Sequence, residues 1–322
     1  MGHKIVYPDA DESVASLFSG ERLGKLEALG DFQIYYDTRP DDETVIERIG
    51  DADTVISGWG MSNAVLTAVP NLEVISFTGL GASTFIDLNE ASRRNITVTH
   101  VLSAASTIAE HTIALILDAA RNVSRLDRDL RRGNWNMDME CMDLRGKTLG
   151  LVGFGRIAQA VVPLAKAFGM QIICWTRNPG RERAAQYDVE FVELDHLLAN
   201  SDVVSLHLLS NPETDGLLNA ERLRLIKPSA LFINTARAKI TDEMALADLL
   251  EAGRIRAAGI DVFADEPVPA DHPFFRLENV VMTPHVAYNS PEALEEMYDT
   301  AVDNLVAFHE GRPQNIATLA ET

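Results

Sequence analysis

Short apolar runs alternate along the chain with segments whose apolar residues recur every three or four positions. The runs, rich in Val, Ile, Phe and Tyr, predict β-strands, and the periodic segments predict amphipathic helices. Before residue 104 we expect strands at Lys4–Tyr7, Phe32–Tyr36, Thr54–Ser57, Val74–Phe77 and Thr97–His100, with helices at Glu21–Leu29, Asp42–Ile49, Ser62–Val69 and Asp87–Arg94. This alternation predicts a parallel α/β sheet.

A second set of the same kind follows residue 147. Its expected strands are Thr148–Val152, Gln171–Trp175, Glu190–Val192, Val203–Leu208, Ala230–Asn234, Ala257–Val262 and Val280–Thr283. Helical segments separate them, such as Asp242–Ala252, and a last helix begins at Ser290-Pro291 and stops at Gly311. The fold class is therefore α/β, with two Rossmann- or flavodoxin-like domains built on parallel sheets.

Between the two sets lies the longest helical pattern, Ser106–Arg132, which Gly133-Asn134 ends. A single helix of this length bridges two bodies or packs against a partner chain. We expect a homodimer through residues 106–132, with the N-terminal half of the helix against the partner.

Length and charge limit the function classes. The 322 residues suit two domains, and the formal net charge of -20 argues against nucleic acid and anionic membranes, which require basic patches. Cys141 and Cys174 are too few for a disulfide framework, so free thiols in a reducing compartment are expected. Neither a signal-peptide pattern nor an apolar run of about 18 residues occurs, so we expect a soluble, cytoplasmic protein.

A glycine turn directly after the strand Thr148–Val152 has the spacing Gly153-x-Gly155-x-x-Ala158 and leads into a helix at Ile157–Phe168. The first Gly allows a tight turn, the second lets the backbone approach a pyrophosphate, and the small third residue lets the helix pack closely. Free N–H groups at this helix start, near Arg156 and Ile157, would face the phosphates. The turn alone is a weak pattern, but its strand and helix flanks indicate a dinucleotide site.

Three polar residues come just after strands of the second set: Arg237, Glu266 and His285. Because parallel strands end at one edge of a sheet, these side chains can meet near the reactive end of a bound nicotinamide. A histidine can donate a proton to a carbonyl oxygen, a carboxylate stabilises its protonated form, and an arginine binds a substrate carboxylate. Singly, each has an ordinary alternative: a helix cap, a solvated loop residue, a histidine at a domain edge.

The chain resembles the D-isomer-specific 2-hydroxyacid dehydrogenases over nearly its whole length. The matching segments are Ala109-Glu110-His111, Gly133-Asn134-Trp135, Leu144–Thr148 with the glycine turn, Asn234–Arg237, Asp261–Pro267 and Thr283-Pro284-His285. The resemblance implies His285 as acid/base, Glu266 as its partner and Arg237 as substrate anchor.

The resemblance also implies a cofactor-binding set and a domain division. Thr235 and Ala236 are expected at the cofactor and Asp261 near the nicotinamide amide. Apart from the resemblance, His207, within the strand Val203–Leu208, is expected either near the cofactor or simply packed. A substrate domain of residues 1–104 plus 287–322 and a dinucleotide domain of residues 105–286 would enclose the active site in the cleft between them. Crossings near 103–105 and 284–288 would let the cleft close and exclude water.

The expected substrate is a small 2-keto acid of the glyoxylate or hydroxypyruvate kind. Backbone N–H groups of Leu80 and Gly81 can hold its carboxylate, and Trp59 and Met61 either wall the pocket or pack between strands. The family usually has two glycines after the arginine, where this chain has Ala238-Lys239. Lys239 either is simply solvated or favours a substrate that carries a second anionic group.

The strand that should carry an acid for the ribose of NAD ends instead in Thr176-Arg177, with Arg181 and Arg183 close behind. No acid there repels a 2′-phosphate, and Arg177 can pair with one, so NADP is favoured over NAD. The alternative is a solvated arginine cluster with NAD or dual preference.

Other classes find less support in the sequence. A nucleotide-sensing corepressor of the same superfamily is one alternative, although the acidic charge argues against it. A formate-type dehydrogenase is another, although Glu266 stands where that branch is expected to carry Gln. No zinc motif occurs, so no metal is expected, and His111 is expected to serve the interdomain helix rather than catalysis.

Overall fold

The computed structural model describes residues 2–37 and 40–318. The chain divides into two compact units, Met1–Ala104 with Ser290–Thr322 and Ala105–Asn289. The first unit is thus built from both ends of the chain, and its second crossing falls after Asn289 rather than at the expected 286/287.

The first unit contains a five-stranded, fully parallel sheet in the order β2-β1-β3-β4-β5. The strands are β1 His3–Ala10, β2 Gly30–Tyr36, β3 Thr54–Ser57, β4 Val74–Phe77 and β5 Thr97–His100. The last three have the bounds that the sequence predicts. This strand order is that of the flavodoxin-like folds, so the expected α/β class is confirmed for this unit.

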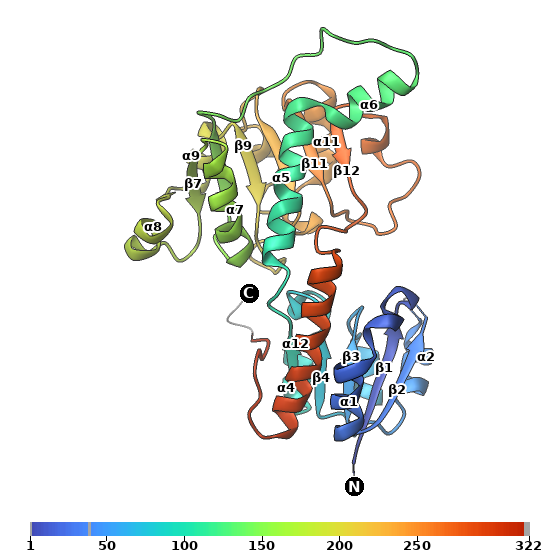
Figure 1. Cartoon of the computed structure of the whole chain (residues 1–322). Helices are drawn as coiled ribbons and strands as arrows, with labels where there is room; N and C mark the ends of the chain where they lie inside the picture. The colour runs from blue at the N-terminus through green and yellow to red at the C-terminus, as the bar shows by residue number, and fades with distance from the viewer. Residues whose placement is uncertain (1, 38–39, 319–322) are drawn as a thin grey trace. The chain divides into compact units, whose positions relative to one another are not determined.

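Helices cover both faces of this sheet (Figure 1). On one face lie α1 (Gly20–Leu29) and α12 (Pro291–His309), which bury Leu26 and Val302 against Ile5. On the other lie α2 (Asp42–Ile49), α3 (Asn63–Ala68) and α4 (Leu88–Arg93). Short 3-10 turns at Glu12–Leu17 and Ala82–Thr84 complete the unit.

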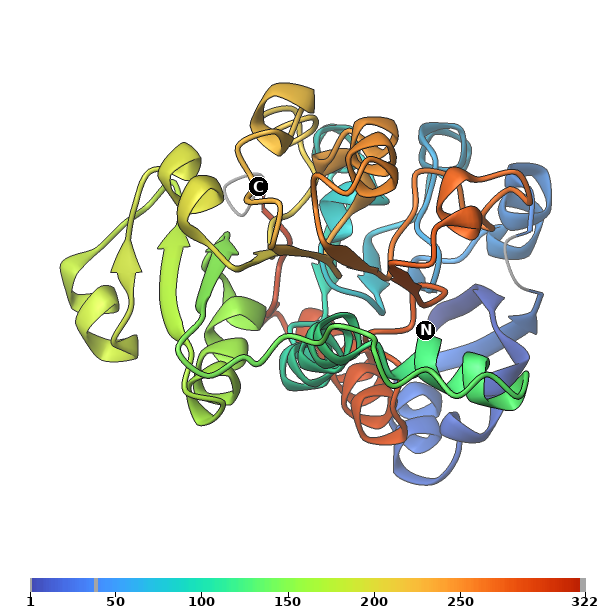
Figure 2. The same cartoon turned by 90° about the horizontal axis from the view of Figure 1, so that it is seen from above.

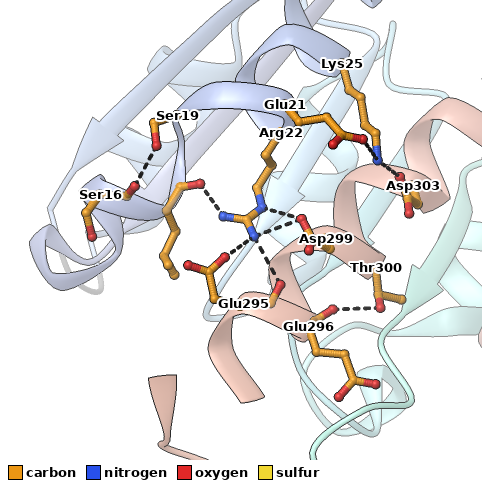
Figure 3. A network of polar contacts seen from close by, with 11 residues as sticks. Ser16, Ser19, Glu21, Arg22, Lys25, Glu295, Glu296, Asp299, Thr300 and Asp303 are labelled. Atoms are coloured by element: carbon orange, nitrogen blue, oxygen red, sulfur yellow. Dashed lines mark hydrogen bonds and ion pairs between the residues drawn. The ribbon is translucent and has the colours of Figure 1, made fainter. Parts of the chain in front are cut away.

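A buried arginine joins the two helices that share a face, although they come from opposite ends of the chain (Figure 3). Arg22 of α1 is 6% exposed; its Nε donates to Asp299 of α12 at 3.0 Å and its Nη2 to Glu295 at 2.5 Å. Nη1 also donates to the Leu17 carbonyl. This network fixes the C-terminal helix to the N-terminal part of the unit.

The second unit contains a seven-stranded parallel sheet in the order β12-β11-β10-β9-β6-β7-β8. Its strands are β6 Thr148–Val152, β7 Gln171–Trp175, β8 Glu190–Phe191, β9 Val203–Leu206, β10 Leu231–Asn234, β11 Ala257–Ile260 and β12 Val280–Met282. The order is that of a Rossmann domain with one added strand, and the direction of winding reverses between β6 and β9. Ligands of such sheets bind at the carboxyl ends of the strands around this point.

Two helical layers cover the second sheet. α5 (Ala105–Arg121) and α7 (Arg156–Ala167) pack on one face, whereas α9 (Leu194–Asn200), α10 (Ala220–Leu223) and α11 (Glu243–Glu251) pack on the other. Figure 2 shows α5, in teal, and α11, in orange, on opposite sides of the strands. A short α8 (Arg181–Tyr187) lies between β7 and β8. In the described part of the chain, none of the helices combines the length and apolarity needed to cross a bilayer.

The expected single helix at Ser106–Arg132 is wrong. Asn122 adopts a left-handed conformation (φ 53°) and separates α5 from α6 (Val123–Arg131), while the Asp118 carboxylate accepts from Ser124 N at 2.8 Å and starts the new helix. The apolar face of α5 packs inside its own unit, with Ile108, Ala109 and Ile116 buried. This face of α5 is thus used within its own unit, and the expected homodimer through residues 106–132 stays a prediction.

Candidate active site

The glycine turn lies at the reversal point of the second sheet. Gly153 has φ +99°, and a Cβ there would come within 2.4 Å of the His207 carbonyl oxygen at the end of β9. Gly155 precedes α7, and a Cβ at this position would meet nothing within 4 Å. Ala158 is fully buried against the sheet. Gly153 and Ala158 are therefore the positions where the turn and helix pack closely on neighbouring strands. The open space needed for a pyrophosphate lies at Gly155, beside Arg156 and Ile157.

The end of β7 carries arginine in place of a carboxylate, and a loop brings an acid to it. Arg177, after Thr176, forms an ion pair with Glu213 from the segment after β9. Arg183 donates to the Phe154 carbonyl and lies 5.2 Å from the centre of the Phe154 ring. Reading the strand end alone missed Glu213, because it is 36 residues away in sequence.

His207 lies at the end of β9 with its Nε2 2.9 Å from the Ser205 hydroxyl. Burial lowers its pKa to about 3, so the imidazole is neutral near pH 7. Both interpretations, packing and a place beside the cofactor, fit this position, because its own carbonyl approaches Gly153.

Hydrogen bonds within the turn after β10 hold Arg237. Asn234 accepts from Ala236 N at 3.0 Å and donates to the Arg237 carbonyl at 3.1 Å. Thr235 lies in the same turn, its hydroxyl 3.0 Å from that of Thr112 on α5. Burial lowers the pKa of Arg237, and the nearby Glu266 carboxylate opposes that shift. The guanidinium is thus largely desolvated, which strengthens its attraction to an anion, whereas the nearby Glu266 carboxylate competes for the same charge.

Glu266 and His285 form a direct pair. Nδ1 of His285 is 2.9 Å from Oε2 and 3.0 Å from Oε1 of Glu266, whose Oε1 also accepts from Phe263 N at 3.1 Å. Because the carboxylate accepts the Nδ1 proton, Nε2 is the ring nitrogen that remains for a substrate. The structure therefore brings together the three residues that the sequence singled out at strand ends.

Asp261 is fully buried at the end of β11, and both its oxygens accept hydrogen bonds from the segment around His285. Oδ1 accepts from the Thr283 hydroxyl and Oδ2 from Ala287 N. The resemblance placed this residue near the nicotinamide amide, without indicating these contacts.

Within the first unit, the candidate substrate residues lie on loops after β3 and β4. Trp59 is 38% exposed, and the carboxylate of Asp9 accepts from its N–H at 2.9 Å and from Gly58 N at 3.1 Å. Gly81, after Leu80, has the left-handed φ of +71° that begins a 3-10 turn. Met61 is buried in the core, so the packing alternative is correct for it.

Comparison with known proteins agrees with this geometry. The family described as "D-isomer specific 2-hydroxyacid dehydrogenase, NAD binding domain" matches residues 113–287. The chain is 38% identical over 304 residues to a glyoxylate reductase of Korarchaeum cryptofilum, covering 91% of each chain. It is 33% identical over 303 residues to a hydroxypyruvate reductase of Blautia hydrogenotrophica, covering 90% of this chain and 93% of the relative.

A solved structure of an acyclic imino acid reductase (Bsp5), in complex with NADPH and D-Arg, superposes with a TM-score of 0.89. It is 29% identical and covers 98% of this chain and 100% of that one. The nucleotide turn, the paired His285 and Glu266 and these similarities lead to one conclusion. The chain belongs to the D-isomer-specific 2-hydroxyacid dehydrogenases, a family of oxidoreductases that bind a nicotinamide cofactor.

Proposed function

We propose that this protein reduces a small 2-keto acid, of the glyoxylate or hydroxypyruvate kind, to the D-2-hydroxy acid. The carbonyl carbon gains a hydride and the carbonyl oxygen gains a proton, so that the C=O bond becomes CH–OH. The names of the two relatives, glyoxylate reductase and hydroxypyruvate reductase, support this substrate class.

The observation that carries the proposal is the pairing of His285 with both oxygens of Glu266. In this pair, Nδ1–H is held by the carboxylate and Nε2–H is the proton donor to the carbonyl oxygen. Glu266 stabilises the charged imidazolium before transfer and fixes the plane of the ring. In the reverse direction, neutral His285 takes the hydroxyl proton.

Arg237 anchors the substrate carboxylate and polarises the adjacent carbonyl. Its desolvated guanidinium and its position one strand away from the Glu266 loop support this role. The N–H groups of Leu80 and Gly81 are proposed to bind a substrate carboxylate, and Trp59, which is partly exposed, to contact the substrate side chain. Lys239 is exposed beside Arg237, which leaves room for a substrate with a second anionic group.

The residues at the glycine turn fit a dinucleotide. Open space at Gly155 and the start of the 12-residue helix α7 suit a pyrophosphate. When bound, the reduced nicotinamide supplies the hydride. Gly153, Gly155, Arg156 and Ile157 would hold the phosphates, and Thr235, Ala236 and His207 would line the nicotinamide half.

NADP is proposed as the preferred cofactor. Arg177 follows β7, where an NAD site carries an acid, and the structurally similar imino acid reductase binds NADPH. Glu213 argues against a preference for NADP, because its carboxylate pairs with the guanidinium of Arg177. A 2′-phosphate must therefore compete with Glu213 for Arg177.

A substrate panel tests the proposed reaction. Purified protein is mixed with NADPH or NADH and with glyoxylate, hydroxypyruvate, pyruvate or phenylpyruvate, and the loss of reduced-nicotinamide absorbance is followed. We expect turnover with the small keto acids, and D-configured product by chiral chromatography. No turnover with any 2-keto acid, despite measurable cofactor binding, would reject the proposed reaction.

We also propose that the protein is a homodimer, with the partner on α6 and the segment after it rather than on α5. Val123, Leu130, Trp135 and Met137 are each more than half exposed, and aromatic and Met side chains are typical of interface cores. Light scattering is expected to give a dimer that W135S/M137S weakens without unfolding. A monomeric wild type would end this proposal.

A further inference from the structure

His285 lies on a strained stretch of backbone. It has φ +54°, in the left-handed region that residues with a Cβ seldom adopt, just after β12. Its N–H donates to the Asp261 carbonyl at 2.8 Å and to the Thr283 carbonyl at 3.0 Å. Such a conformation persists only where surrounding bonds impose it.

The Asp261 side chain supplies those bonds. It is fully buried, and its Oδ1 accepts from the Thr283 hydroxyl at 2.5 Å and from Val286 N at 3.0 Å. Its Oδ2 accepts from Ala287 N at 3.0 Å. One carboxylate thus binds residues on both sides of His285 in the sequence. Hydrogen bonds to a charged group are stronger than those between neutral groups.

The next helix layer extends the network. Nε2 of His111, on α5, lies 3.0 Å from the Thr283 hydroxyl oxygen. Since that hydroxyl gives its proton to Asp261, it accepts from Nε2–H of His111. The adjacent residue, Thr112, donates to the Ile108 carbonyl at 2.8 Å and lies 3.0 Å from the Thr235 hydroxyl. Consecutive residues of α5 therefore contact the loop of His285 and the loop of Arg237.

We propose that Asp261 and Thr283, braced by His111, are positioning residues that hold His285 in its left-handed conformation and so aim its Nε2. This role differs from the cofactor contact that the family resemblance suggests for Asp261. The proposed positioning role depends on the proposed function only in those tests that measure turnover.

Amide hydrogen exchange tests the positioning without turnover. In Asp261→Asn, the side-chain NH2 group faces one of the three hydrogen-bond donors that now point at the carboxylate, and the negative charge is lost. The backbone N–H groups of Val286 and Ala287 should therefore exchange at least about tenfold faster. Exchange in β6, in the same unit, should not change. Unaltered exchange at Val286 and Ala287 would overturn the proposal whatever reaction the protein catalyses.

Kinetics then separate positioning from cofactor binding. In Thr283→Val, which keeps the shape but removes the hydroxyl, kcat for keto acid reduction should fall about tenfold, with the Kd of NADPH within about twofold of wild type. Thr148→Val, a hydroxyl deletion at the start of β6, serves as the matched control and should leave kcat and Kd unchanged. His111→Gln should lower kcat less than Thr283→Val, because His111 hydrogen-bonds the His285 loop only through Thr283 and lies 3.6 Å from Oδ1 of Asp261.

Two kinetic results would contradict the proposal. Unchanged kcat in Thr283→Val would show that the network does not aim His285. In Asp261→Asn, the Kd for NADPH could rise by the same factor by which kcat/KM falls. That result would show that Asp261 is a cofactor ligand. If Asp261→Asn does not fold, Thr283→Val decides alone; if wild type reduces no keto acid, the proposed function fails and hydrogen exchange decides the positioning.

Discussion

The imidazole Nδ1 of His285 lies 2.9 Å from Oε2 of Glu266, and the second carboxylate oxygen lies 3.0 Å away. This contact joins residues that are 19 positions apart in sequence and that follow two neighbouring strands, β11 and β12. It assigns one ring nitrogen to the protein and leaves the other for a substrate.

Replacing the carboxylate tests this contact. Glu266→Gln keeps the shape but removes the negative charge that stabilises the imidazolium, so kcat for reduction should fall about 10- to 100-fold. Steady-state kinetics at fixed pH measure kcat, and an unchanged kcat would show that Glu266 does not act through His285.

The two glycines of the turn should respond differently to alanine. Gly155→Ala adds a Cβ in open space at a φ of -80°, so the unfolding free energy should stay within about 0.5 kcal/mol while the Kd of NADPH rises about tenfold or more. Gly153→Ala has φ +99° and a clash with the His207 carbonyl, and should lose about 2–3 kcal/mol of stability. Urea unfolding and cofactor fluorescence titration measure both. Normal cofactor binding by Gly155→Ala would contradict the phosphate site.

Cofactor preference should follow the charge at the end of β7. Arg177→Asp should lower the ratio of kcat/KM for NADPH over NADH about tenfold or more, because it replaces a phosphate-binding cation with an anion. Glu213→Gln should raise the same ratio, because the 2′-phosphate no longer competes with the carboxylate paired to Arg177. Arg222→Asp, which disrupts the ion pair with Asp195 elsewhere in the unit, is the control. An unchanged ratio in Arg177→Asp would remove the argument for NADP.

The buried Asp9 should make stability depend on pH. Burial raises its pKa from 3.8 to about 6, although hydrogen bonds from Gly58 and Trp59 oppose the shift. A raised folded-state pKa favours the protonated form, so this contribution to stability is complete below about pH 4 and is lost as the pH rises through about 6, by up to about 3 kcal/mol.

Comparison with Asp9→Asn isolates that effect, because other titrating groups are common to both proteins. The unfolding free energy of wild type relative to Asp9→Asn should decrease between about pH 4 and about pH 7. Urea unfolding at the two pH values measures it. A difference that does not vary with pH would mean that Asp9 titrates normally.

Much of the fold follows from local sequence pattern. Thr54–Ser57 and Val74–Phe77 are buried on both faces and were predicted with their observed bounds, because a continuous apolar run is the pattern of such a strand. Asn122 shows the limit of periodicity. The helical pattern continues across it, but its backbone is left-handed and the helix breaks there.

The candidate site was predictable where strand ends converge and unpredictable where distant side chains meet. Arg237, Glu266 and His285 each follow a parallel strand, so their approach follows from topology. The pairing of Glu213 with Arg177 and the contact of His111 with Thr283 depend on loop and helix packing. Neither leaves a spacing pattern in the sequence.

The proton-donor role of His285 is the central claim, and His285→Ala tests it most directly. Single-turnover reduction of glyoxylate and the Kd of NADPH are measured on the same protein, with correct folding checked by thermal unfolding. The account predicts a rate lower by about 10²- to 10⁴-fold with a Kd within about twofold of wild type. A rate that is retained, or a Kd that weakens as much as the rate falls, would contradict it.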